Sequence, residues 1–198
     1  MEKQQKRYGE WIYFVIIAVY FMVICCTVPV VYGINDDTTM RDIAAGAITG
    51  TPDGHLIFVK YALGKILSII YLVLPGVDWY ALVWLGLIVF CFILIVFRMH
   101  SLCMRKGVNP FLEILGYLTF FSLVFLKHFA EFQFTTVAAV TAGTAIYVYY
   151  TIEPTDKMSV RIRDYAIVLF LMWLTYCIRS SVFMMALPFG GILFLFKR

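Results

Sequence analysis

WIYFVIIAVYFMVICCTVPVVY (residues 11–32) is a run of 22 residues without a charged side chain. A transmembrane helix needs about 20 consecutive apolar residues, with a tolerated range of roughly 17–25. The apolar core of a signal peptide is shorter, about 7–15 residues, and no small-residue cleavage site follows this run. We therefore expect a retained first transmembrane helix, with Lys3, Lys6 and Arg7 on its cytoplasmic side.

The composition of the whole chain agrees with a membrane location. Of its 198 residues, 63% are hydrophobic and only 14% are charged, whereas a soluble domain has about 25% charged residues. No basic patch with interleaved aromatic residues is present, so we expect no nucleic-acid partner. The five cysteines include no CxxC pair. They are therefore expected to pack as small apolar side chains rather than to form a disulfide framework or bind zinc.

Further apolar runs determine the expected topology. The run 56–74 contains Lys60 and Lys65, so it either crosses the bilayer or lies along its outer surface. The positive-inside rule separates these alternatives. If the run crosses, 11 of the 16 Lys and Arg residues lie outside, whereas 11 lie inside if it remains at the outer surface. The second topology is therefore expected.

The expected fold is an all-α, polytopic integral membrane protein that forms a single membrane domain over residues 1–198. Residues 1–10 form a cytoplasmic tail, residues 33–78 form a large external loop, and both termini lie on the cytoplasmic side of the cell membrane. The six expected transmembrane helices are 11–32, 79–97, 110–126, 134–152, 165–178 and 182–196.

Two short juxtamembrane helices are expected in the external loop. In the first, apolar residues recur at helical spacing from Met40 to Ile48, and Thr39 and Asp42 match a Thr-x-x-Asp start signal. GTPDGH (50–55) predicts a turn after this helix, because Pro52 and Gly54 suit its corners. The second helix is expected to be apolar except for one polar stripe along its surface. This stripe consists of Lys60, Tyr61, Gly64, Lys65 and Ser68.

GINDDTTMRD (33–42) places Asp36 and Asp37 directly after the first predicted span. If Thr39 caps the following helix, neither aspartate is needed as its cap. The pair is either a solvated turn or contains a general base at the membrane surface, since a base must reach a substrate hydroxyl. Lys60 and Lys65 either snorkel towards lipid headgroups or bind an anionic headgroup.

KHFAEFQF (127–134) and IRSS (178–181) bring further polar residues to the same side. Acids and bases at one membrane depth indicate a functional site, although loop ends can also be polar independently of one another. For His128 alone the second interpretation is preferred. The ionisable residues expected at the outer leaflet are Asp36, Asp37, His55, Lys60, Lys65, Lys127, His128, Glu131 and Arg179.

These residues include several patterns of a known superfamily. An amphipathic helix follows the acidic pair, and Glu131 provides a second external acidic position before a crossing. KYALGK (60–65) is similar to Lys-Pro-Pro-Leu-Gly of aminoarabinose transferases and Pro-Pro-Leu-Gly-Lys of protein O-mannosyltransferases, with Tyr61 and Ala62 in place of the prolines. FQFTTVAAV (132–140) and RSSVFMMALPF (179–189) resemble stretches of uncharacterised bacterial members. The chain thus resembles the glycosyltransferase C superfamily of polytopic membrane enzymes.

This resemblance implies an inverting transfer of a sugar from a polyprenyl-phosphate carrier to an external glycan, lipid or protein acceptor, such as a cell-envelope polysaccharide. Asp36 or Asp37 would be the base, and Lys60, Arg179 and Lys65 would bind the phosphate leaving group. His55, His128 and Glu131 are further candidate substrate-binding residues. Asp37 and Glu131 would hold a divalent cation, Mg²⁺ or Mn²⁺, and the prenyl tail would lie in lipid against the spans.

Two other functions are compatible with the sequence. A transporter or flippase for an anionic lipid-linked substrate would place charges at the membrane midplane, whereas the charges here cluster at span ends. A non-catalytic, truncated relative is the second alternative. Members of the superfamily usually continue through further spans, so the chain is expected to be a fragment, a minimal N-terminal module or a truncated relative.

Overall fold

The computed structural model describes residues 2–196, with side chains from residue 13 onward except those of 194 and 196. The expected cytoplasmic side chains of Lys3, Lys6, Arg7, Lys197 and Arg198 therefore lie outside the described part. The described chain is all-α apart from one pair of two-residue strands. Its elements are α1 (Glu2–Thr27), β1 (Val31–Tyr32), α2 (Asn35–Ala45), α3 (Tyr61–Val73), α4 (Trp79–Lys106), α5 (Pro110–Phe120), the π-helix η1 (Phe121–Phe125), α6 (Leu126–Ala130), β2 (Glu131–Phe132), α7 (Phe134–Thr151), α8 (Met158–Ile178) and α9 (Ser180–Phe196).

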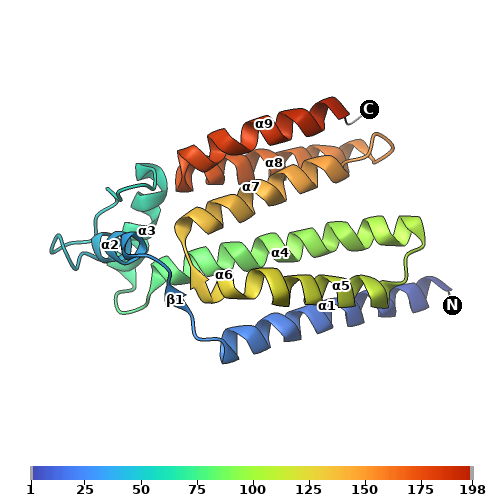
Figure 1. Cartoon of the computed structure of the whole chain (residues 1–198), viewed down its shortest axis with the longest axis horizontal. Coiled ribbons are helices and arrows are strands. Elements are labelled where there is room, and N and C mark those ends of the chain that lie inside the picture. The colour runs from blue at the N-terminus through green and yellow to red at the C-terminus, as the bar shows by residue number, and fades with distance from the viewer. Residues whose placement is uncertain (1, 197–198) are drawn as a thin grey trace.

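The long helices lie side by side along the longest axis of the molecule (Figure 1). The helices α2 and α3 cover one end of this bundle, where β1 pairs in parallel with β2 through Val31 with Glu131 and Tyr32 with Phe132. The loops after α4 and α7 lie at the opposite end, together with both chain termini (Figure 1). The segment 33–78 is thus separated from the termini by the length of the bundle.

Two helical stretches are long and apolar enough to span a membrane by length and composition. They are Trp79–Lys106, with 28 residues, and Pro110–Ala130, with 21 residues across α5, η1 and α6. Tyr13–Thr27 and Ser180–Leu193 are shorter apolar helices. The all-α class is therefore confirmed, together with two candidate membrane spans, whereas six crossings remain a prediction.

The helix α3 is too short to cross a bilayer. Its 13 residues extend about 20 Å at 1.5 Å per residue, less than the roughly 30 Å of the hydrocarbon core.

The loop before α3 packs closely on the first turns of this helix. A Cβ atom added at Gly64 would lie 2.2 Å from the carbonyl oxygen of Gly54. The expected polar stripe is wrong in part, because Gly64 and Ser68 are buried against the protein while Lys60 and Lys65 are exposed.

The first of the two short helices in the segment 33–78 begins earlier than the sequence pattern predicts. The helix α2 starts at Asn35, and Thr39 is not its cap, because the Thr39 hydroxyl donates to the carbonyl of Asn35 from inside the helix. Asp36 and Asp37 consequently lie in the first turn, where the helix dipole favours negative charge. A start at Asn35 therefore satisfies the acidic pair better than a start at Thr39.

The later helices also differ from their predicted bounds. The helix α8 begins at Met158 rather than at residue 165, so it extends seven residues further towards α7 than the predicted span 165–178. Its extension into a charged segment is stabilised by ion pairs of the buried Asp164 with Arg98 of α4 and with Arg163. Because buried charges need partners, the pair between Arg98 and Asp164 also attaches α8 to α4.

Candidate functional site

Asp37 joins three parts of the chain at the end of the bundle covered by α2 and α3. Its side chain has no exposed surface. Its Oδ1 atom accepts hydrogen bonds from the Tyr80 hydroxyl at 2.8 Å and from the backbone N–H of Phe134 at 3.1 Å. Its Oδ2 atom is buried and has no hydrogen-bond partner in the described structure. Asp37 thus links α2 to the first turns of α4 and α7, while its second carboxylate oxygen is buried without a hydrogen-bond partner.

Burial changes the protonation of this carboxyl group. Desolvation raises the pKa of Asp37 from 3.8 to about 6, because the low-dielectric interior disfavours the charged form. The hydrogen bonds from Tyr80 and Phe134 lower this pKa, and the negative charge of Asp36 raises it. The carboxyl group of Asp37 therefore ionises at a higher pH, about 6, than an ordinary aspartate does.

The neighbouring Asp36 has a different environment. Its side chain is exposed, and it forms no hydrogen bond or ion pair with any residue that the structure describes. Successive residues of a helix point about 100° apart, so burial of Asp37 turns Asp36 away from the bundle. Of the two carboxylates, that of Asp37 is therefore buried in contacts with α4 and α7, and that of Asp36 is accessible.

Arg179 ends α8 and lies over two aromatic rings. Its guanidinium carbon is 4.8 Å from the centre of the Phe134 ring and 5.2 Å from that of Phe58. Its Nη1 donates to Thr135 Oγ1 at 2.8 Å, and its Nε donates to Ser181 Oγ at 3.2 Å. No described carboxylate forms an ion pair with Arg179. This half-buried cation is therefore held in place without charge compensation, which suits an anionic ligand.

Lys60 lies near the same end of α8. Its backbone N–H donates to the Cys177 carbonyl at 2.7 Å, which attaches the start of α3 to the last turn of α8. Its ammonium group lies 5.2 Å from the centre of the Tyr176 ring. Because Cys177 is two residues before Arg179, Lys60 and Arg179 are anchored to neighbouring positions.

The remaining predicted site residues lie outside this set of contacts. His55 is exposed and interacts with Asp53, with 2.7 Å between His55 Nδ1 and Asp53 Oδ1, while its ring packs against Tyr61. Lys65 is exposed on α3 and Glu131 on β2. None of these side chains forms a hydrogen bond or ion pair with Asp37 or Arg179 in the described part of the chain. The structure thus brings Asp37, Lys60 and Arg179 into one connected set and leaves the others around it.

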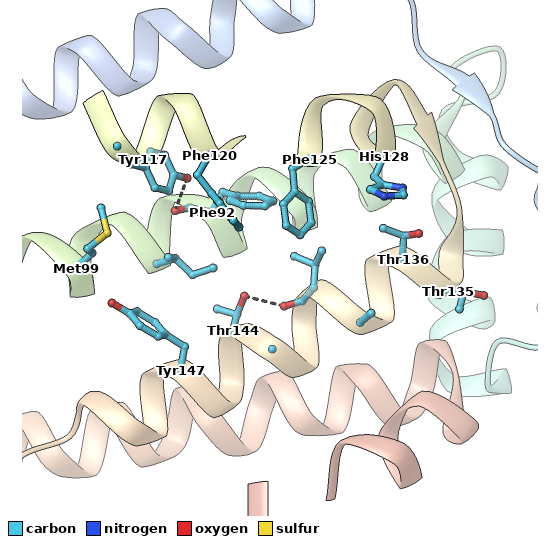
Figure 2. A pocket seen from close by; sticks show the side chains of 15 residues that line it. Phe92, Met99, Tyr117, Phe120, Phe125, His128, Thr135, Thr136, Thr144 and Tyr147 are labelled. Carbon is cyan, nitrogen blue, oxygen red and sulfur yellow. Dashed lines mark hydrogen bonds between the residues drawn. The ribbon is translucent and has the colours of Figure 1, made fainter. Parts of the chain in front are cut away.

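An apolar groove of about 610 Å³ runs between α4, α5, α6 and α7. Most of its lining is aromatic or aliphatic, including Phe92 and Phe120, with Met99 and Tyr147 at one end (Figure 2). His128, Thr135 and Thr136 gather at the other end (Figure 2). Because Thr135 is the hydrogen-bond partner of Arg179, the polar end of the groove adjoins the cation.

Sequence reasoning missed the residues that build these contacts. None of Tyr80, Phe58, Phe134 and Thr135 is among the candidate site residues that the sequence predicts. Tyr80 is fully buried and packs edge-on against Trp84, with 5.5 Å between the ring centres. The only signal in the sequence is the position of Tyr80 and Phe134, each within two residues of the start of a helix.

The described residues do not complete a metal site. Asp37 offers one unpartnered oxygen, whereas Mg²⁺ and Mn²⁺ require several oxygen ligands. No group of three or more His, Cys, Asp or Glu side chains within residues 13–193 and 195 could hold a metal ion. A cation between Asp37 and Glu131 stays a prediction.

No protein-family model, curated protein or solved structure matches this chain. The residues and their geometry therefore provide the functional argument.

Proposed function

We propose that the chain is a multi-pass membrane protein with six crossings and cytoplasmic termini, and that it transfers a sugar from a polyprenyl-phosphate carrier to an external acceptor with inversion. One observation carries this proposal. Phe134 holds the carboxylate of Asp37 with its backbone N–H and lies beneath the cation of Arg179 with its ring. The first turn of α7 thereby holds Asp37 and an uncompensated cation, and this cation adjoins the polar end of an apolar groove through Thr135.

Asp36 is the better candidate for the general base, because a base must reach the proton that it abstracts. Asp36 is exposed, whereas Asp37 is enclosed and acts as the positioning residue for the first turn of α2. In the proposed reaction Asp36 takes the proton of the acceptor hydroxyl while that oxygen attacks the anomeric carbon. The bond from this carbon to the phosphate oxygen breaks, and its electron pair leaves with the polyprenyl phosphate.

Arg179 and Lys60 are the proposed partners of this phosphate. Negative charge develops on the leaving oxygen as the glycosidic bond breaks, and positioned cations stabilise such charge. Arg179 is oriented by Thr135, Ser181 and two rings, so little reorganisation is needed when the phosphate binds.

The groove is the proposed site for the first part of the prenyl tail. Its lining is predominantly apolar over about 610 Å³, and its polar end adjoins Arg179. A carrier with its phosphate at Arg179 could therefore extend its chain along α4 and α7. His128 would lie near the junction of the phosphate and the tail.

The test is transfer of a labelled sugar from a polyprenyl-phosphate donor in vesicles that contain the purified protein and an extract of membrane acceptors. Asp36→Asn should retain donor binding but lower transfer by about 10²–10⁴-fold, the usual cost of removing a general base. Asp42→Asn is the matched control, because it removes a carboxylate from the same helix that bonds only to Arg41.

Full transfer by Asp36→Asn would exclude Asp36 as the base. Failure of the unmodified protein to bind polyprenyl phosphate would contradict the whole proposal. Donor binding without transfer by any variant, including the unmodified protein, would favour a non-catalytic relative.

A further inference from the structure

A second cavity lies at the end of the bundle opposite to Asp37. It has a volume of about 490 Å³ and is lined by the last residues of α4 and α7, the loop that follows α7 and the start of α8. These segments meet near the chain termini (Figure 1). The cavity is therefore separate from the groove and the acidic pair.

Two cations line this cavity without carboxylate partners. Lys106 is the exposed last residue of α4, and Arg161 is a half-buried residue near the start of α8. Neither forms an ion pair with any acid in the described structure. The one carboxylate in the lining, Glu153, already binds Arg105, with 2.8 Å between Glu153 Oε2 and Arg105 Nη1. The cavity thus has positive charge that the protein itself leaves uncompensated.

Arg161 also has an unused hydrogen-bond donor. Its Nε atom is buried and has no hydrogen-bond partner, although a buried N–H normally finds an acceptor. A group with negative charge and several acceptor oxygens would compensate the two cations of the lining. A phosphate group has this chemistry.

The surroundings favour a phosphate that carries a lipid. Tyr150 and Tyr165 line the cavity and are exposed, and tyrosine is enriched where one end of the ring is apolar and the other is wet. Met158 and Ile162 are exposed on the same turns of α8. A cavity with uncompensated positive charge thus adjoins an apolar surface.

We propose that the cavity between Lys106 and Arg161 binds the phosphate of an anionic phospholipid headgroup. The site does not depend on the proposed glycosyl transfer, because it shares none of its residues. The guanidinium group of Arg161 and the ammonium group of Lys106 would bind the phosphate, and the acyl chains would lie against the exposed side chains of α8.

The experiment compares phosphatidylglycerol with zwitterionic phosphatidylcholine on the purified full chain. Lipid retained by the protein is measured by native mass spectrometry, and the thermal midpoint is measured with each lipid. The unmodified chain should retain phosphatidylglycerol preferentially and melt at a higher temperature with it. Lys106→Ala and Arg161→Gln should each lower this retention about tenfold, the effect of losing one charge-assisted hydrogen bond.

Lys157→Ala is the matched control, because it removes an exposed lysine from the same end of the protein but not from the cavity lining. It should leave the retention unchanged. If Lys106→Ala and Arg161→Gln retain as much phosphatidylglycerol as the unmodified chain and Lys157→Ala do, the site is overturned. Inorganic phosphate at millimolar concentration is the second probe. If it binds in a Lys106-dependent manner while phosphatidylglycerol is retained no better than phosphatidylcholine, the lipid assignment is wrong.

Discussion

The backbone N–H of Phe134 donates a hydrogen bond to Asp37 Oδ1 over 3.1 Å, although 97 positions of sequence separate the two residues. The ring of Phe134 lies beneath the guanidinium group of Arg179, and the next residue, Thr135, accepts a hydrogen bond from that group. The first turn of α7 thus positions the carboxylate of Asp37 from α2 and the guanidinium group of Arg179 from the end of α8. Changes at either charged residue should therefore affect the other through α7.

Asp37→Asn should remove one pH dependence of stability. Because the native pKa of Asp37 is about 6 and the ordinary value is 3.8, the native state holds a proton between these pH values that the unfolded state has released. Stability therefore falls as pH rises through this window, by up to about 3 kcal/mol. Asn cannot ionise, and its amide oxygen can still accept from Tyr80 and Phe134.

Thermal midpoints from pH 4 to 7.5 measure this effect. The difference between the unmodified chain and Asp37→Asn should move in favour of the variant as pH rises. Asp36→Asn is the control, because Asp36 is exposed, and it should keep the pH dependence of the unmodified chain. Parallel curves for the unmodified chain and Asp37→Asn would show that Asp37 is not buried as described.

Arg179→Lys should weaken binding of a polyprenyl phosphate even though the positive charge remains. Lysine lacks the planar group that contacts two rings and donates to both Thr135 and Ser181. Binding to carrier-containing vesicles should fall about tenfold for Lys and further for Ala. Lys127→Ala removes an exposed charge at the same end of the bundle and should bind normally. An Arg179→Ala variant with unchanged affinity would exclude Arg179 as the phosphate ligand.

Gly64→Ala should destabilise the packing of α3. The added Cβ would lie 2.2 Å from the carbonyl oxygen of Gly54, so α3 must move away from the preceding loop. Overpacking of this kind costs about 1–3 kcal/mol. Gly86→Ala in α4 meets no atom within 4 Å and should be neutral or stabilising by about 0.5–1 kcal/mol. Thermal melting of both variants measures the contrast, and equal midpoints would refute the close contact.

Cysteine labelling tests the predicted topology. In a variant without native cysteines, a cysteine at Val77 should react with a membrane-impermeant reagent in intact cells, and one at Val108 should be protected. Both valines are exposed, and Val108 avoids the left-handed backbone of Gly107, where φ is 68°. Protection at Val77 together with labelling at Val108 would contradict this topology, because a crossing by residues 56–74 predicts that result.

Much of the fold follows from local sequence. Apolar runs with few charges predict helices over 79–97, 110–126 and 134–152, because a long apolar segment buries its backbone best as a helix. Helices lie over each of these runs in the structure. The helix ends were less predictable. The charged start of α8 is stabilised by the contact of Asp164 with Arg98, which is distant in sequence.

The sequence by itself determined the all-α class and two short helices within residues 33–78, while it placed the acidic pair ahead of the first of them rather than in its first turn. Only the tertiary structure decided that Asp37 is enclosed while Asp36 is exposed, and that Gly64 faces the protein. Asp36 and Asp37 have identical side chains in adjacent positions, so no local pattern distinguishes them. Their difference depends on the rotation of α2, which packing against Tyr80 and Phe134 determines, and these partners come from helices that begin far along the chain.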